Sequence, residues 1–251
     1  VRLFWYLLLE WGRRGFDEGT LARRGMLQAA ERHLRRAIAD ETLRARLRPN
    51  YPLGCKRLIY ANDFYPALAR PNVALVTEAI SHITANGVCT ADGVEHAADV
   101  LVCATGFDAQ HSLLVPIQGR GGRTLAEAWA DGPQAHLGLT VAGFPNLVLM
   151  LGPNTATGHT STLLFIEPGV AWALRAMAEV ERRGQHWLDV KPAAMSAFNT
   201  LLQQRLHHSV WNQCRSWYRD ANGRNTALFP GFTGEYKRLL RTQSFADFEF
   251  G

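Results

Sequence analysis

The sequence predicts an α/β fold, and three features of the chain support this prediction. Apolar residues recur at helical spacing in the first 48 residues and again after residue 161. Short runs rich in β-branched residues, bounded by turn residues, lie between these helical segments. Strands that alternate with helices are typical of an α/β class with parallel sheet components.

The first quarter of the chain is expected to be helical. Leu27, Leu34 and Ile38 share one helical face, and Pro49 ends the segment. Beyond it, apolar runs predict strands at 57–60, 73–76 and 100–103. The turn pairs Asn86-Gly87 and Asp92-Gly93 predict a small antiparallel meander over residues 79–97.

The second half of the chain is expected to contain one strand and several helices. Its pattern predicts helical turns at 124–129, a buried strand at 146–151 and helices at 192–208 and 234–241. A long helix is expected from Ser161 to Arg183, with Thr160 or Ser161 as its N-cap. Pro168 is expected to kink or delay this helix.

Composition excludes several classes of protein. The 251 residues are 47% hydrophobic and 20% charged, which rules out a disordered or fibrous chain. The longest apolar run, at 3–9, is far shorter than the roughly 20 residues of a membrane span, so no stable membrane insertion is predicted. The four cysteines form no C-x-x-C pair, so neither a disulfide framework nor a metal site is indicated, and a reduced, cytoplasmic compartment is expected.

Positive charge is concentrated near the start of the chain. The first 57 residues carry 13 Lys and Arg against 6 Asp and Glu, whereas the remainder carries 14 against 16. Such a basic segment can serve nucleic acid, a membrane surface or a phosphate-bearing cofactor. Because its arginines scatter among apolar residues without a recognised DNA- or RNA-binding motif, no nucleic-acid partner is predicted.

Several catalytic and nucleotide-binding motifs are missing from the sequence. It contains no G-x-x-x-x-G-K-[ST] phosphate loop, no H-E-x-x-H helix and no G-x-S-x-G elbow. It also contains no G-x-G-x-x-G loop, so the usual pyrophosphate cradle of a dinucleotide-binding domain is not in this chain.

Three segments carry groups suited to ligand binding. The first ends in Lys56-Arg57, whose side chains point to opposite sides of an extended segment. A lysine suits a phosphate and an arginine offers a permanent, forked cation, although an ordinary basic pair is the alternative. The second and third are 99–108 and 143–161, where a predicted strand runs into a glycine-bearing loop. A turn after a strand and a well-capped helix are their alternatives.

In order and spacing, these segments resemble the C-terminal half of class B flavoprotein monooxygenases, in particular the Baeyer–Villiger type. The resemblance includes Asp63-Phe-Tyr-Pro66, Arg70-Pro-Asn-Val73, Cys214-Arg-Ser-Trp-Tyr218 and Gly223-Arg-Asn225. It implies a partial flavoprotein fold with two dinucleotide-binding domains, in which parallel sheet elements accompany the meander and a helical insert. The N-terminal FAD Rossmann half would be absent.

The resemblance also implies a division of the chain. Residues 1–48 would be the helical insert of the NADPH domain, 49–110 the second half of that domain, and 111–251 the part returning to the FAD domain. The family's glycine-rich loops lie upstream of the matching region. The chain is therefore expected to be a truncated part that needs the missing N-terminal half.

In this family, NADPH reduces FAD, and the flavin peroxide formed with O2 inserts one oxygen beside a ketone carbonyl, giving an ester or lactone. The resemblance implies that Arg57 stabilises this anionic peroxide and that Lys56 faces the 2′-phosphate of NADPH. The remaining implied cofactor-binding residues are Ala104, Thr105 and Gly106 and Trp217 for NADPH, with Gly158, His159 and Thr162 for the flavin.

Three alternatives stay open on the sequence. Trp217 is equally explained as a buried core tryptophan. The chain could belong to an N- or S-hydroxylating flavin monooxygenase of the same class. It could also be a non-catalytic remnant that acts only as a binding module.

Overall fold

The computed structural model describes residues 2–106 and 116–251, which fall into two compact units. Among the described residues, the large unit contains 2–27, 50–58 and 116–251, and the small unit contains 28–49 and 59–106. Each unit is described by itself. Because the two units interleave along the chain, the expected division at 48/49 and 110/111 stays a prediction.

The small unit contains helices and a three-stranded sheet. Its elements are the end of α2 (Leu21–Ala37), α3 (Glu41–Leu47), α4 (Phe64–Leu68), β1 (Ile80–Ile83), β2 (Gly87–Thr90) and β3 (Glu95–Ala97). Asp40 caps α3, because its Oδ1 accepts a hydrogen bond of 2.8 Å from the backbone N–H of Thr42. The expected helices in this part of the chain are thereby confirmed.

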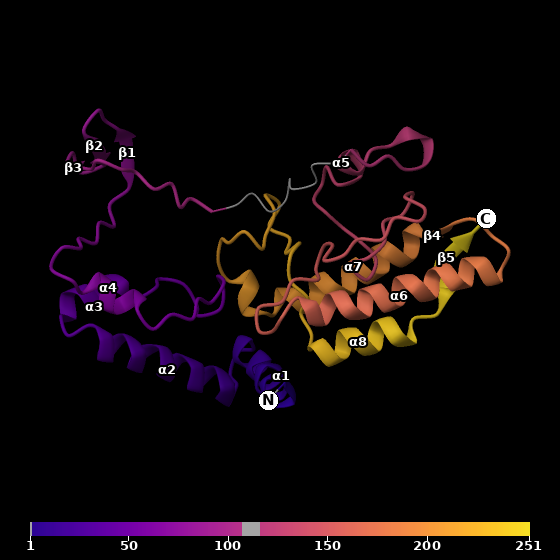
Figure 1. The fold of residues 1–251 in the computed structure, drawn as a ribbon, viewed down its shortest axis with the longest axis horizontal. Coiled ribbons are helices and arrows are strands. Elements are labelled where there is room, and N and C mark those ends of the chain that lie inside the picture. The colour runs from indigo at the N-terminus through magenta and orange to yellow at the C-terminus, as the bar shows by residue number, and fades with distance from the viewer. Residues whose placement is uncertain (1, 107–115) are drawn as a thin grey trace. The chain divides into compact units, whose positions relative to one another are not determined.

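The meander predicted over 79–97 is confirmed. Its three strands pair antiparallel in the order β1-β2-β3, with the two expected turns between them (Figure 1). Gly93 has φ +84°, the left-handed conformation that its turn requires. Gly87 is needed for space, because a Cβ there would stand 2.0 Å from the carbonyl oxygen of His96.

The strands predicted at 57–60, 73–76 and 100–103 do not form. A strand needs a hydrogen-bonded neighbour, and no described residue pairs with these three runs. Their apolar side chains are consequently left open to solvent. Ile59 is 87% exposed and Val102 is 85% exposed.

The large unit holds the remaining elements. Its helices are α1 (Arg2–Gly12), α5 (Leu125–Ala128), α6 (Leu163–Arg182), α7 (Pro192–His207) and α8 (Thr233–Thr242), with the start of α2; its short 3-10 turns are η1 (Arg13–Phe16), η2 (Arg120–Gly122), η3 (Val210–Asn212) and η4 (Phe245–Asp247), and its strands are β4 (Leu188–Val190) and β5 (Phe248–Phe250). The helices expected at 124–129, 192–208 and 234–241 are confirmed.

The core of the large unit lies where α6, α7 and α8 meet. On α6 the buried side chains of Phe165, Trp172 and Ala176 recur at helical spacing. Phe165 stacks on Tyr236 of α8, with 4.6 Å between the ring centroids. Leu206 of α7 joins the same cluster and is fully buried. Figure 1 shows α6 and α8 side by side.

Three expectations about this unit are wrong in detail. The N-cap of the long helix is Thr162, rather than Thr160 or Ser161, and the helix begins at Leu163. It continues through Pro168 without interruption. Residues 146–151 form no strand, because Asn146 and Leu151 adopt positive φ angles of 60° and 59°. Both sheets formed by the described residues are antiparallel, and their parallel pairing is limited to the single bridge Ala156–Leu228.

One disulfide bond joins Cys55 to Cys214, with 6.0 Å between the two Cα atoms. This finding corrects the expectation that the cysteines stay unpaired. The absence of a C-x-x-C pattern carries no information about two residues separated by 159 positions. Cys89 and Cys103 are free.

No helix in the described part of the chain is long and apolar enough to cross a membrane.

Tyr236 provides a test of the helical core. Its hydroxyl donates a 3.0 Å hydrogen bond to the carbonyl oxygen of Leu137, and the side chain is 1% exposed. Burial raises the pKa of Tyr236. Tyr236→Phe leaves the Leu137 carbonyl without this donor, so we expect the free energy of unfolding in urea to fall by about 1–2 kcal/mol. Tyr60→Phe serves as the control, because Tyr60 is 85% exposed; an equal loss in both variants would contradict the assignment.

Candidate functional site

Lys56 and Arg57 lie at the surface of the large unit. They belong to the segment 50–58, which forms neither helix nor strand, and both side chains are exposed. The Lys56 Nζ atom stands 4.4 Å from the centroid of the Tyr51 ring, a cation–π contact that steadies the ammonium group. Both cations therefore remain available to an anionic ligand.

The disulfide brings a second predicted segment to this place. Cys55 precedes Lys56, and its partner Cys214 lies three residues before Trp217. Trp217 is 44% exposed, and its ring centroid is 4.5 Å from that of the buried Tyr218. Trp217 is thus exposed in the described part of the chain rather than packed in its core.

The positive charge of Arg57 affects the pKa of Tyr218. Burial raises the pKa of Tyr218, and the positive charge of Arg57 opposes part of that rise. A permanent cation therefore lies near the tyrosine that follows Trp217. Together with the disulfide, this interaction places Lys56, Arg57 and Trp217 in one region of the large unit, which we call the basic–aromatic surface.

The loop that carries Gly158 is linked to the same region through Phe16. A Cβ at Gly54 would stand 2.8 Å from the Phe16 ring, and one at Gly158 would stand 3.5 Å from it. The Gly158 Cβ would also come within 3.2 Å of the ring of Trp211, which packs on Phe16 at a centroid distance of 5.2 Å. Two glycines therefore let two loops close on one pair of rings.

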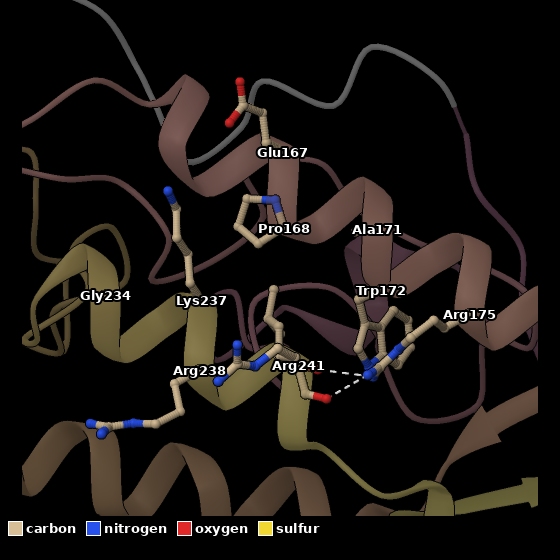
Figure 2. A pocket seen from close by; sticks show the side chains of 10 residues that line it. Glu167, Pro168, Ala171, Trp172, Arg175, Gly234, Lys237, Arg238 and Arg241 are labelled. Atoms are coloured by element: carbon tan, nitrogen blue, oxygen red, sulfur yellow. Dashed lines mark hydrogen bonds between the residues drawn. The ribbon is translucent and has the colours of Figure 1, made fainter. Parts of the chain in front are cut away.

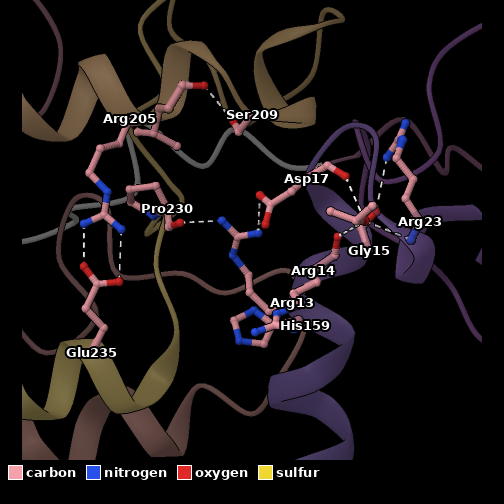
Figure 3. A network of polar contacts seen from close by, with 12 residues as sticks. Arg13, Arg14, Gly15, Asp17, Arg23, His159, Arg205, Ser209, Pro230 and Glu235 are labelled. Atoms are coloured by element: carbon pink, nitrogen blue, oxygen red, sulfur yellow. Dashed lines mark hydrogen bonds and ion pairs between the residues drawn. The ribbon is translucent and has the colours of Figure 1, made fainter.

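His159 is buried in a polar network at the base of this loop (Figure 3). Its Nδ1 shares a 3.0 Å hydrogen bond with Thr157 Oγ1, and its Nε2 lies 3.5 Å from Glu10 Oε1. Burial lowers the pKa of His159 to about 4; Glu10 opposes this shift and the nearby Arg13 adds to it. His159 is consequently neutral at neutral pH.

Glu10 and Arg13 complete this network. Glu10 Oε1 accepts a 2.9 Å hydrogen bond from the backbone N–H of Thr233. Thr233 is the first residue of α8, and the positive end of the helix dipole stabilises a carboxylate there. Arg13 donates to Asp17 Oδ1 at 2.7 Å and to the Pro230 carbonyl oxygen at 2.5 Å. Its guanidinium also lies 5.0 Å from the centroid of the Trp211 ring.

Sequence reasoning did not identify Glu10, Arg13, Phe16 or Trp211. The first three precede the loop around Gly158 by more than 140 positions, and no local pattern connects them to it. A single sequence offers no signal for such contacts.

Unsatisfied polar groups mark the N-terminal approach to α6. Thr160 Oγ1 and the indole Nε1 of Trp211 are buried, and neither has a hydrogen-bond partner among the residues that the structure describes. Thr162 is partly buried at the N-cap position and makes no side-chain capping bond. A buried polar group without a partner is costly to the folded state.

The third predicted group belongs to the other unit. Ala104, Thr105 and Gly106 are exposed residues of the small unit, and Gly106 has φ +99°. Lys56, Arg57 and Trp217 lie in one region of the large unit. Ala104, Thr105 and Gly106 belong to the small unit. Asp108, the end of the predicted segment, lies outside the described residues.

A cavity of about 530 Å³ opens between α6 and α8 (Figure 2). Its lining includes Trp172, Arg175, Lys237 and Arg241, and the guanidinium of Arg175 donates to the carbonyl oxygen of Leu240 at 2.9 Å. None of the predicted site residues lines it. The described residues contain no group of three or more His, Cys, Asp or Glu side chains placed to hold a metal ion.

Two bacterial proteins illustrate the sequence similarity. A Baeyer–Villiger monooxygenase of Pseudomonas aeruginosa is 39% identical over 240 residues, which are 94% of this chain and 46% of that protein. A Baeyer–Villiger monooxygenase of Streptomyces coelicolor is 41% identical over 229 residues, which are 88% of this chain and 44% of its own length. The chain thus spans somewhat less than half the length of these curated relatives. No family model matches.

Solved structures give the same result for the fold. An oxidised steroid monooxygenase bound to NADP is 29% identical with a TM-score of 0.81, covering 94% of this chain and 47% of that one. A cyclohexanone monooxygenase from Rhodococcus sp. Phi1 bound to NADP+ is 30% identical with a TM-score of 0.80, covering 93% and 46%. The α/β class is confirmed by these likenesses.

Fold and sequence together place the chain among the flavoprotein monooxygenases. Within that class it corresponds to part of the Baeyer–Villiger type, as its motifs predicted.

The buried His159 predicts a pH-dependent stability. The unfolded state binds a proton near pH 6.5 and the folded state only near pH 4, so stability is full above pH 6.5 and is lost as pH falls toward 4. We expect this histidine to cost about 2 kcal/mol of unfolding free energy between pH 7.5 and pH 5. His159→Asn should remove that part of the pH dependence in urea melts, whereas the exposed His208→Asn should keep it.

Proposed function

We propose that this chain contributes to an FAD- and NADPH-dependent monooxygenase that inserts one oxygen atom of O2 beside a ketone carbonyl, giving an ester or lactone. The observation that carries the proposal is the convergence of Lys56, Arg57 and Trp217 on one surface of the large unit. The relatives and the NADP-bound solved structures support the choice of coenzyme.

The basic–aromatic surface fits the coenzyme. Lys56 would bind the 2′-phosphate of NADPH as a compact point charge, and the indole N–H of the exposed Trp217 would donate to the nicotinamide nucleotide. The loop from Gly158 to Thr162 would approach the flavin. For Ala104, Thr105 and Gly106 of the small unit, a role in binding the nicotinamide coenzyme stays a prediction.

Arg57 would hold negative charge at the reacting oxygen. When bound, the flavin supplies the chemistry that activates O2 with electrons taken from NADPH. Arg57 presents a guanidinium that keeps its proton, and its neighbourhood is fixed by the disulfide beside it. A fixed cation stabilises charge that develops on oxygen, which is the largest single contribution that a protein group makes to many such reactions.

A longer enzyme would cover surfaces that are open here. Leu163, Val170, Leu174 and Met177 lie on one face of α6 and are 43–66% exposed. Exposed apolar stripes of this kind mark interaction sites. We infer that the glycine-rich half of the enzyme covers this face. We also infer that 1–48 is the helical insert, 49–110 the part of the NADPH domain and 111–251 the part of the FAD domain.

The arginine assignment is tested in a full-length enzyme made by joining this chain to the N-terminal part of the Pseudomonas aeruginosa relative. We expect Arg57→Ala to lower ketone-to-ester turnover about 100- to 1,000-fold, because a charge-stabilising group of this kind contributes about 10²–10³ in kcat. NADPH-driven flavin reduction, followed by absorbance, should persist. The exposed Arg182→Ala on α6 is the control. Unchanged ester formation in Arg57→Ala would show that the arginine is misassigned, and turnover of amines or sulfides alone would favour the hydroxylase class.

Lys56 is tested by coenzyme preference in the same enzyme. Lys56→Ala should raise the KM for NADPH about tenfold or more and leave the KM for NADH unchanged, because only NADPH carries the 2′-phosphate that a lysine would neutralise. Equal changes for both coenzymes would contradict the assignment. No turnover even in the unaltered joined enzyme would favour the non-catalytic remnant.

A further inference from the structure

The Cys55–Cys214 bond joins the two segments that form the basic–aromatic surface. Cys55 is fully buried, and its neighbours Lys56 and Arg57 are exposed. Cys214 is partly buried, and Trp217 follows three residues later at the surface. A covalent bond between distant segments thus lies directly below the groups that the proposed function assigns to the coenzyme and the reacting oxygen.

Besides the disulfide, the segment on the Cys55 side is held by non-covalent contacts. Residues 50–58 form neither helix nor strand. Arg23 Nη1 donates a 3.1 Å hydrogen bond to the Leu53 carbonyl oxygen, and the Phe16 ring packs on Gly54. Both contacts hold the segment before Cys55. Tyr51 and Leu58, near its two ends, pack partly buried against the hydrophobic core. The bridge is the covalent link next to Lys56.

The segment on the Cys214 side is firmly anchored. Tyr218 is 1% exposed, and its carbonyl oxygen accepts a 2.9 Å hydrogen bond from the backbone N–H of Thr226. Trp211, three residues before Cys214, is fully buried against Phe16. The disulfide therefore ties a segment without regular structure to one that the core holds in place.

We propose that Cys55 and Cys214 are positioning residues that hold Lys56 and Arg57 beside Trp217, and that a dithiol reductant releases this surface. This inference rests on the proposed function for the meaning of the surface. In the release step, a thiolate of the dithiol attacks one sulfur and the S–S bond breaks, giving a mixed disulfide. The second thiolate then closes the oxidised dithiol, and the two electrons and two protons end on Cys55 and Cys214 as thiols.

Hydrogen exchange on the chain itself tests the positioning. The bridged chain is compared with the chain kept in dithiothreitol and with the double variant Cys55→Ala/Cys214→Ala. We expect amides of 51–58 to exchange at least about tenfold faster in both unbridged forms, while amides of α6 and α7 stay protected. Reoxidation should restore protection to the reduced chain but not to the double variant. The double variant Cys89→Ala/Cys103→Ala, which lacks only the free thiols, should behave as the unaltered chain.

The second readout is binding of 2′,5′-ADP, a probe that carries the 2′-phosphate, measured by calorimetry beside 5′-ADP. The bridged chain should bind 2′,5′-ADP at least about fivefold more tightly than either unbridged form, with no such difference for 5′-ADP. An exchange rate that rises equally throughout the large unit, or that does not change at 51–58, would overturn the proposal. Local loosening of 51–58 without any 2′,5′-ADP binding would leave the positioning intact and would instead contradict the coenzyme role of Lys56.

Discussion

The contact between Phe16 and Trp211 is the constraint on which the candidate site depends. The two rings are buried with their centroids 5.2 Å apart, and the loops of Gly54 and Gly158 close on them. A side chain at Gly54 would collide with the Phe16 ring, and that glycine also has φ +87°. Four segments that are distant in the chain are thereby fixed against one another, and every exposed group of the site in the large unit is built on them.

Electrostatics divides this arrangement into a compensated interior and an uncompensated surface. Inside, Arg13 is paired with Asp17, and Glu10 is bonded to the N-terminus of α8 while His159 stays neutral. Burying a charge is tolerable when an opposite charge or a hydrogen bond compensates it. At the surface, Lys56 and Arg57 lie side by side in the chain, so the field that an arriving ligand meets is positive. This division suits the recognition of a phosphate-bearing coenzyme.

The parts of the fold that could be predicted from the sequence are those governed by local chemistry. The turn pairs at Gly87 and Gly93 specify the meander because hairpin geometry depends on few residues. The helices follow from apolar spacing that is complete within each segment. The absence of strands at 57–60 and 100–103 could not be predicted in this way, since a strand exists only with a partner, and the described residues provide none. Lys56 and Trp217 could be singled out by motif, but their proximity depends on a bond across 159 positions.

The burial of that bond links its chemistry to the motion of the segment. Thiol–disulfide exchange needs a thiolate to reach one sulfur, and its rate therefore depends on access. Cys55 is fully buried, so attack on its sulfur requires the segment 50–58 to leave the core. The partly buried Cys214 offers the more accessible sulfur, and attack there leaves Cys55 as the departing thiolate in an apolar setting, which disfavours the charge. Either route is slow while Phe16 packs on Gly54. Phe16, whose ring packs on both Trp211 and Gly54, thus supports the site and also protects the disulfide that aligns it.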